Sequence, residues 1–452
     1  MKNIYLTLLL VVLCCSTLNF GCKKYLAEKP DKRISTPDKL TDLQGILSGY
    51  ALMNAQYPSA GEISADDYYL TDASWSSAAE KQRNFYLWQK YDNMATDWTS
   101  PYKCIFNANL IMETIPTLNI SINEEKDAQI LKGQALFIRS FYHYALAQLF
   151  APAYHPEEAT KTLGIPLKLV TDVEAPSVRM SVAENYKQIL KDAMQSVPLL
   201  PEAAQAKYLP SKPAAYAHLA RINLMMGNFK AAELFADSCL QLNKTLMDYN
   251  TISSTSAIPF VQFNNEVLYD CRTAAPAILA QTRARIEPEV WNAYADNDLR
   301  KAIFFKKNTD ASYAFKGNYT GLNTAAIFSG LAVDEVLLTR AECRVRNGKV
   351  TEGMADLNTL LKQRYKTGTF IPLSIQSSAV ALNTILTERR KELLFRNVRW
   401  SDLKRLNLEP VFAKTLTRTI KQLVYRLKPN DERYVFQIDR TAILLSGMPQ
   451  NP

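Results

Sequence analysis

The stretch ILTERRKELLFRNVRWSDLKRL, residues 385–406, predicts a helix that carries a charge on its apolar side. An apolar face with helical spacing is formed by Leu382, Leu386 and Leu393, and Arg389 falls on that same face. A guanidinium in this position needs a carboxylate partner, because a buried charge without one is strongly destabilising. We therefore expect a buried ion pair that supports the fold rather than a catalytic arginine.

Helical periodicity also marks the segment of residues 131–149. Apolar residues recur there at steps of three and four positions, which is typical of one buried helix face. These residues are Leu131, Ala135, Ile138, Tyr142, Ala145 and Leu149. A long amphipathic helix is the structure that this spacing predicts.

Two further segments predict pairs of antiparallel helices. They read LARINLMMGNFKAA, residues 219–232, and RAECRVRNGKVTEG, residues 340–353. Each places a glycine, Gly227 or Gly348, between two apolar helical runs, where a tight turn is needed. The repeated pattern resembles a tetratricopeptide helical hairpin.

The overall composition is that of a folded protein, with 47% hydrophobic and 21% charged residues. With 452 residues, the chain is long enough for several domains or for one large multi-helix domain. Only 14 glycines occur, which argues against a body built mainly of tight hairpins. The net charge is +9, but the basic residues are spread along the chain, so we expect no nucleic-acid partner.

The cysteines and histidines do not form a metal-binding pattern. None of the seven cysteines lies in a CxxC motif, and the three histidines are far apart. We therefore expect no zinc or iron–sulfur site, and no cofactor. Cys104, Cys239 and Cys343 fall in apolar helical patterns, which predicts buried thiols.

The amino terminus has the features of an export signal. Lys2 precedes the apolar run IYLTLLLVVL, which is too short to span a membrane comfortably. The sequence LNFGC, ending at Cys22, resembles a bacterial lipobox. We expect a signal peptide over residues 1–21, lipid attachment at Cys22 and a polar tether over residues 22–40. The alternative is an ordinary signal peptide that is cut nearby.

Two stretches lack helical period and are rich in aromatic and polar residues, namely residues 57–75 and the longer tract 243–332. Within the latter, EVLYD predicts a short strand. Sugars present apolar C–H faces and many hydroxyls, so aromatic side chains beside polar ones suit them. The candidate ligand contacts are Tyr68, Tyr69, Trp75, Tyr313, Asn318 and Tyr319. The helical spacing of Trp291 and Tyr294 favours a place in the core.

No motif for phosphate binding, for dinucleotide binding or for a nucleophile elbow occurs. Glu62 with Asp66 and Asp67 offers the residue types of a glycosidase pair. Neighbours in sequence do not establish the separation that such a pair needs across a sugar ring. We expect no enzymatic activity and no catalytic residue, and a glycoside hydrolase is the less favoured alternative.

Several segments, in order along nearly the whole chain, resemble the RagB/SusD family of outer-membrane lipoproteins for nutrient uptake. WTSPYKCIFNANLIMETI, residues 98–115, and GQALFIRSFYHYALAQLF, residues 133–150, are two of them. The strongest is the opening stretch, residues 385–406, in which Arg396–Asn397 stands where many relatives have Glu-Gly. The matching motif residues are Arg139, Glu388, Arg389, Glu392, Arg399, Trp400 and Asp402.

The resemblance implies a mainly α-helical body of tetratricopeptide-type helix pairs, with loops and a few short strands over it. It implies a single SusD-like body over residues 41–452, with parts at 41–242, 243–332 (a loop-rich insertion) and 333–452. It also implies an outer-membrane protein, anchored by lipid and facing the cell exterior. Its expected partners are a TonB-dependent, SusC-like transporter and an oligosaccharide or other nutrient. The alternative function is a lipid-anchored scaffold for envelope proteins that binds no small ligand.

Overall fold

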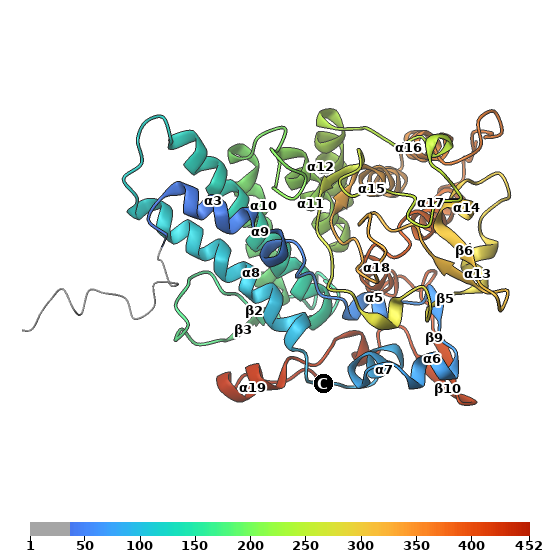
Figure 1. Cartoon of the computed structure of the whole chain (residues 1–452), viewed down its shortest axis with the longest axis horizontal. Coiled ribbons are helices and arrows are strands. Elements are labelled where there is room, and N and C mark those ends of the chain that lie inside the picture. Colours follow the sequence, from blue (N-terminus) through green and yellow to red (C-terminus); the bar gives the residue numbers. More distant parts are fainter. Residues whose placement is uncertain (1–36) are drawn as a thin grey trace, which may run out of the picture. The chain divides into compact units, whose positions relative to one another are not determined.

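A computed structural model describes residues 37–452, within which Leu40–Pro452 form one compact unit (Figure 1). The predicted signal peptide and the predicted lipid-attachment residue Cys22 lie outside the described residues. Among the residues described, no helix combines the length and the hydrophobicity needed to cross a membrane.

A series of helices, each packed on the next, forms the framework of this unit. In chain order its first three members are α8 (Ala95–Thr114), α9 (Glu125–Phe150) and α10 (Val182–Ser196). The predicted apolar residues of α9 are all buried, and most of its other residues are buried too. Helix α9 is covered on nearly all sides because α8, α10 and α3 (Leu40–Ser48) all pack against it.

Both predicted helical hairpins are present. The first joins α11 (Lys212–Met225) to α12 (Phe229–Leu242), and the second joins α15 (Val333–Arg346) to α16 (Val350–Lys362). Their turn glycines, Gly227 and Gly348, have positive φ angles of 74° and 83°. Glycine adopts this left-handed conformation without strain, so it can end one helix and start the next. Helix α12 packs on α15, which joins the two hairpins into one scaffold.

The opening stretch forms the end of α17 (Ser378–Glu392) and all of α18 (Arg399–Leu406). Arg389 is buried as predicted, and its Nε donates to Asp402 Oδ2 at 2.8 Å. The buried face of α17 is centred on Ala381 and Ile385, one position before the predicted leucines Leu382 and Leu386, which stay partly exposed. The ion pair holds α18 against α17.

The bend between these two helices explains the departure at Arg396–Asn397. Asn397 has a φ of 57°, a left-handed conformation that asparagine tolerates better than most residues other than glycine. Its backbone N–H donates to Glu62 Oε2 at 2.8 Å. Arg396 is buried and donates to Asp334 at 3.0 Å, so the positive charge in place of the acidic residue has a carboxylate partner.

The strands are short and form five two-stranded antiparallel sheets among the described residues. The predicted strand EVLYD corresponds to β4. The pairs are β1 (Tyr68–Tyr69) with β5 (Arg285–Ile286), β2 (Leu163–Pro166) with β3 (Arg179–Ser181), β4 (Val267–Tyr269) with β8 (Leu331–Ala332), β6 (Phe305–Lys307) with β7 (Tyr313–Phe315), and β9 (Leu416–Ile420) with β10 (Leu423–Leu427).

The remaining helices are short and connect the framework to these sheets. They are α4 (Tyr50–Met53), α5 (Ala60–Ser64), α6 (Asp72–Ser76), α7 (Glu80–Tyr86), α13 (Pro288–Asn292), α14 (Arg300–Phe304) and α19 (Arg440–Ser446). Single 3₁₀ turns occur at Ile115–Thr117, Val197–Leu199, Tyr249–Thr251, Ala277–Leu279 and Glu432–Tyr434. Cys104, Cys239 and Cys343 are buried free thiols, as predicted.

Candidate functional site

The two irregular stretches that carry the predicted ligand residues meet at one end of the body. Strand β1 pairs with β5, which places Tyr69 opposite Arg285. Arg285 Nε in turn donates to Asp310 Oδ2 at 3.1 Å, close to β7. In Figure 1 the labels α6, β5, α13 and β6 lie together on the right-hand side. We call the four partly exposed aromatic residues there, Tyr69, Trp75, Trp291 and Tyr313, the aromatic end.

The centre of the aromatic end is a stacked pair of rings. The ring centroids of Trp291 and Tyr313 are 3.5 Å apart, and the ring planes differ by 13°. Lys301 Nζ lies 5.1 Å from the Trp291 ring centroid. Trp291 packs on the core, as its spacing predicted, yet it remains partly exposed beside Tyr313. The pair offers a rigid aromatic surface, while Tyr294 is buried.

Trp75 extends the aromatic end on helix α6. Cationic groups lie over its ring, with Arg83 and Lys421 each 5.6 Å from the centroid. Its indole nitrogen has no hydrogen-bond partner among the described residues. The neighbouring Arg283 donates to the Ser77 carbonyl at 3.2 Å, which links α6 to the segment before β5.

The other three predicted ligand residues are used inside the protein. Tyr68 is 1% exposed, and its hydroxyl donates to the Ile63 carbonyl at 2.7 Å. Tyr319 is 2% exposed, and its hydroxyl donates to Glu266 at 2.8 Å. The Asn318 side chain donates to the Ala326 carbonyl and shapes its own loop. Successive strand residues point to opposite faces, so Tyr69 faces outward where Tyr68 faces the core. The burial of Tyr68 and Tyr319 therefore corrects the expectation that they contact a ligand.

The carboxylates considered as a glycosidase pair are bound within the protein. Asp66 accepts from Arg399 at 2.7 Å and from Lys414 at 3.0 Å. Burial would raise the pKa of Asp66, but Arg399 and Arg390 outweigh burial and hold the pKa well below its ordinary value. Asp67 pairs with Arg390 at 2.7 Å. Arg399, which belongs to the stretch of residues 385–406, therefore serves the fold through its ion pair with Asp66.

Glu62 lies 1% exposed beneath this cluster, and burial raises its pKa from 4.5 to about 8, with a further contribution from Asp67. The folded state thus holds a proton on Glu62 that the unfolded chain releases above pH 4.5. The stabilisation that this causes is fully present below pH 4.5 and is lost as the pH rises through about 8.

We expect Glu62→Gln to reduce the loss of thermal stability between pH 5.5 and pH 8.5, because glutamine resembles the neutral acid and does not titrate. Melting temperatures of both proteins at both pH values would measure the effect, which is on the order of a few kcal/mol at most. Other titrating groups are common to both proteins and cancel in the comparison. An equal pH dependence in the two proteins would contradict the assignment.

Three buried carboxylates, those of Glu266, Asp334 and Glu392, lie within 4.8 Å of one another. Arginines supply the positive charge that this cluster needs. Arg364 bridges Glu266 and Glu392 at 2.8 and 2.7 Å, and Arg396 pairs with Asp334 at 3.0 Å. The cluster therefore forms part of a buried ion network with these arginines.

Comparison with known proteins identifies the family. Residues 24–224 match the family described as "Starch-binding associating with outer membrane", and residues 302–443 match the SusD/RagB family. The chain belongs to the SusD/RagB family. A SusD-like protein P2 from Formosa agariphila is 23% identical over 474 aligned positions, covering 90% of each chain.

Solved structures of the SusD superfamily share this fold. One from Bacteroides thetaiotaomicron has a TM-score of 0.76 at 22% identity and covers 92% of this chain and 100% of its own. A SusD-like carbohydrate binding protein from Bacteroides vulgatus has a TM-score of 0.68 at 18% identity, covering 91% and 97%. The mainly helical SusD fold with tetratricopeptide-type pairs, expected from the sequence, is thus confirmed.

Proposed function

We propose that this SusD-family protein binds an oligosaccharide at its aromatic end and delivers it to a TonB-dependent transporter in the outer membrane. The stacked and partly exposed pair of Trp291 and Tyr313 is the observation that carries the ligand class. A flat aromatic surface matches the apolar face of a sugar ring, and it is held rigid before the ligand arrives.

Polar groups that suit sugar hydroxyls surround this pair. Asp310 accepts from Arg285, the exposed Asn292 directly follows Trp291, and the exposed Lys307 is paired with Tyr313 between strands β6 and β7. Trp75 on α6 provides a second aromatic side chain at the same end. An aromatic platform with a few placed polar groups is the usual composition of a small-ligand site.

The location and the partner belong to the same proposal. The match to a family described as associating with the outer membrane supports anchoring through lipid on Cys22, with the body facing the cell exterior. The expected partner is a SusC-like, TonB-dependent transporter. No reaction is part of the proposal, because the carboxylates Glu62, Asp66 and Asp67 are committed to internal contacts.

Replacing Trp75, Trp291 and Tyr313 together by alanine is expected to weaken glycan binding by more than about tenfold, because each ring contributes on the order of 1 kcal/mol. Isothermal titration with a panel of oligosaccharides would measure the affinity of the wild type and of the variant. Tyr216→Ala with Phe235→Ala is the matched control, since it removes another partly exposed stacked pair far from this end.

The same titration separates the proposal from the alternative scaffold function. A scaffold without a small ligand gives no heat with any glycan of the panel. Binding that survives the triple replacement unchanged would place the ligand elsewhere and contradict the role of the aromatic end.

A further inference from the structure

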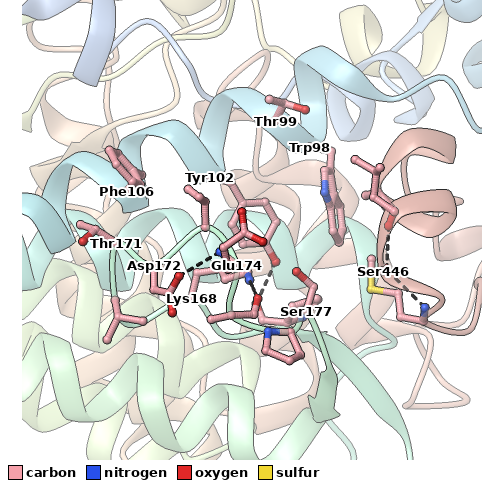
Figure 2. A pocket seen from close by; sticks show the side chains of 18 of the residues that line it. Trp98, Thr99, Tyr102, Phe106, Lys168, Thr171, Asp172, Glu174, Ser177 and Ser446 are labelled. Atoms are coloured by element: carbon pink, nitrogen blue, oxygen red, sulfur yellow. Dashed lines mark hydrogen bonds between the residues drawn. The ribbon is translucent and has the colours of Figure 1, made fainter. Parts of the chain in front are cut away.

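A groove of about 900 Å³ lies among three segments that are distant in sequence. One wall is helix α8, with Trp98, Tyr102 and Phe106 on successive turns, as Figure 2 shows. The second wall is the connection between β2 and β3, residues 166–177, and the third is the C-terminal segment 439–448 with helix α19. We call this hollow the α8–α19 groove. In Figure 1 the elements that form its walls, labelled α8, β2, β3 and α19, lie on the left, whereas the elements of the aromatic end lie on the right.

Aliphatic side chains stand exposed along the rims of the groove. Val173 on the β2–β3 connection is 79% exposed, and Leu445 on α19 is 84% exposed. Helix α19 contains Ala442, Ile443 and two leucines but has no buried residue. Exposed apolar side chains that gather around one groove are typical of interaction sites on proteins.

The lining of the groove does not suit a sugar. Trp98 is 6% exposed, because it packs perpendicular to Phe150 at 4.8 Å and tilted on Tyr102 at 5.0 Å between ring centroids, so little of its ring is open to a ligand. The Tyr102 hydroxyl donates to the Pro166 carbonyl.

Two polar side chains of the lining are satisfied within the chain. The Lys168 ammonium donates to the Ala175 carbonyl at 2.8 Å, and Ser446 donates to the Ala442 carbonyl at 2.6 Å. A sugar needs free hydrogen-bonding partners for its hydroxyls, and an apolar occupant does not. The groove therefore favours apolar side chains.

The charged side chains that line the groove are one base, Lys168, and three acids, so the groove carries a net negative charge although the whole chain carries +9. Asp172 and Glu174 form no ion pair among the described residues. Asp439 accepts from two backbone N–H groups, those of Met94 and Thr441. Nearby arginines are already paired, Arg139 with Asp192 and Arg440 with Asp92. A cationic occupant is the electrostatic complement of this surface.

The wall that carries these acids is held in place before any partner arrives. Asn109 on α8 donates to the carbonyls of Lys168 at 3.1 Å and of Val170 at 3.2 Å. Arg139 donates to Asn109 Oδ1 at 3.0 Å, and Glu113 accepts from the Thr171 N–H at 2.9 Å. A preformed wall lowers the entropic cost of binding.

We propose that the α8–α19 groove binds a segment of a partner protein that combines aliphatic side chains with lysine or arginine. The aliphatic side chains lie between the rims at Val173 and Leu445, and the basic group faces Asp172 and Glu174. This proposal does not rest on glycan binding, because the groove and the aromatic end share no residue.

Selection of short random peptides displayed on phage against the intact protein, followed by fluorescence polarisation of the selected peptides, tests the proposal. The expected peptides contain leucine, isoleucine or valine together with lysine or arginine. Val173→Glu with Leu445→Glu should weaken their binding by about tenfold or more. Asp172→Asn with Glu174→Gln should weaken it several-fold and remove most of its dependence on salt.

Matched controls are available on other surfaces. Ile371→Glu with Val411→Glu changes two equally exposed aliphatic residues outside the groove, and Glu157→Gln with Glu352→Gln removes two exposed acids outside it. Both control proteins should bind the peptides as the wild type does. Melting temperatures of all variants check that exposed substitutions leave the fold intact.

Several results would overturn the proposal. If Val173→Glu with Leu445→Glu leaves the peptide affinity unchanged, the peptides bind outside the groove. If Asp172→Asn with Glu174→Gln leaves the affinity unchanged, these two acids do not attract a basic group of the peptide. In analytical ultracentrifugation, a dimer that Leu445→Glu converts to a monomer would make a second copy of this chain the occupant. Binding to phospholipid vesicles that is lost in the same variant would make a membrane the occupant.

Discussion

Glu392→Gln is expected to lower the free energy of unfolding by about 3–5 kcal/mol, because it removes the charge that two buried arginines share. Glu392 Oε2 accepts from Arg300 at 2.9 Å, and Oε1 accepts from Arg364 at 2.7 Å. All three side chains are fully buried. Glutamine has the same shape, but its NH₂ group would face a guanidinium that also only donates.

The protonation state of Glu392 supports this expectation. Burial alone would raise its pKa, but Arg364 and Arg300 outweigh burial and lower the pKa below its ordinary value. The ionised form therefore stabilises the folded state above the ordinary pKa of glutamate, and this contribution is lost as the pH falls through the lower folded pKa.

Urea unfolding at neutral pH would measure the change, with Glu432→Gln as the control. Glu432 pairs with Lys90 at 3.2 Å, but both side chains are more than half exposed. Such surface pairs contribute about 0–1 kcal/mol, so the control should resemble the wild type. A loss no larger than that of the control would contradict the role of Glu392. If Glu392→Gln does not accumulate as folded protein, the milder Glu392→Asp, which keeps the charge, should fold and be destabilised less.

Arg389→Ala is expected to lower thermal stability by a comparable amount without a selective loss of ligand binding. Arg389 Nε donates to Asp402 at 2.8 Å, and one terminal nitrogen lies 3.9 Å from Glu335. Alanine would leave a cavity and would remove the contact that joins α17 to α18 and α15. Asp402 keeps one partner, since Arg405 donates to it at 2.8 Å.

Differential scanning calorimetry together with glycan titration below the melting temperature separates the two possible roles of Arg389. A structural residue lowers the melting temperature and leaves the affinity of the folded fraction unchanged. Arg440→Ala is the control, because Arg440 pairs with Asp92 on the surface and is 68% exposed. A wild-type melting temperature with binding abolished would show that Arg389 serves the ligand and not the fold.

Local sequence patterns were sufficient for much of the fold. Gly227 and Gly348 between apolar runs predicted two helical hairpins, because only a turn glycine takes a left-handed conformation there without strain. Ordered matches along the chain predicted the SusD family. Of the tyrosines proposed as ligand contacts, Tyr68 and Tyr319 are buried whereas Tyr69 and Tyr313 are partly exposed, because residue type does not tell which side chain points inward. Only the structure shows that Tyr68 is buried while its neighbour Tyr69 is partly exposed. It also shows that Trp291 stays partly exposed and stacks on Tyr313.

The sequence by itself predicted the long helix around residues 131–149, the two helical hairpins, the need of Arg389 for a carboxylate, and the family of the chain. Those features depend on neighbours three or four residues apart or on short motifs in order. Only the tertiary structure decided which carboxylates serve the arginines, for Arg300 and Glu392 are 92 positions apart. It alone built the α8–α19 groove from segments near residues 100, 170 and 445. Such contacts arise when distant segments pack together to bury apolar surface, and no local pattern records which segments will meet.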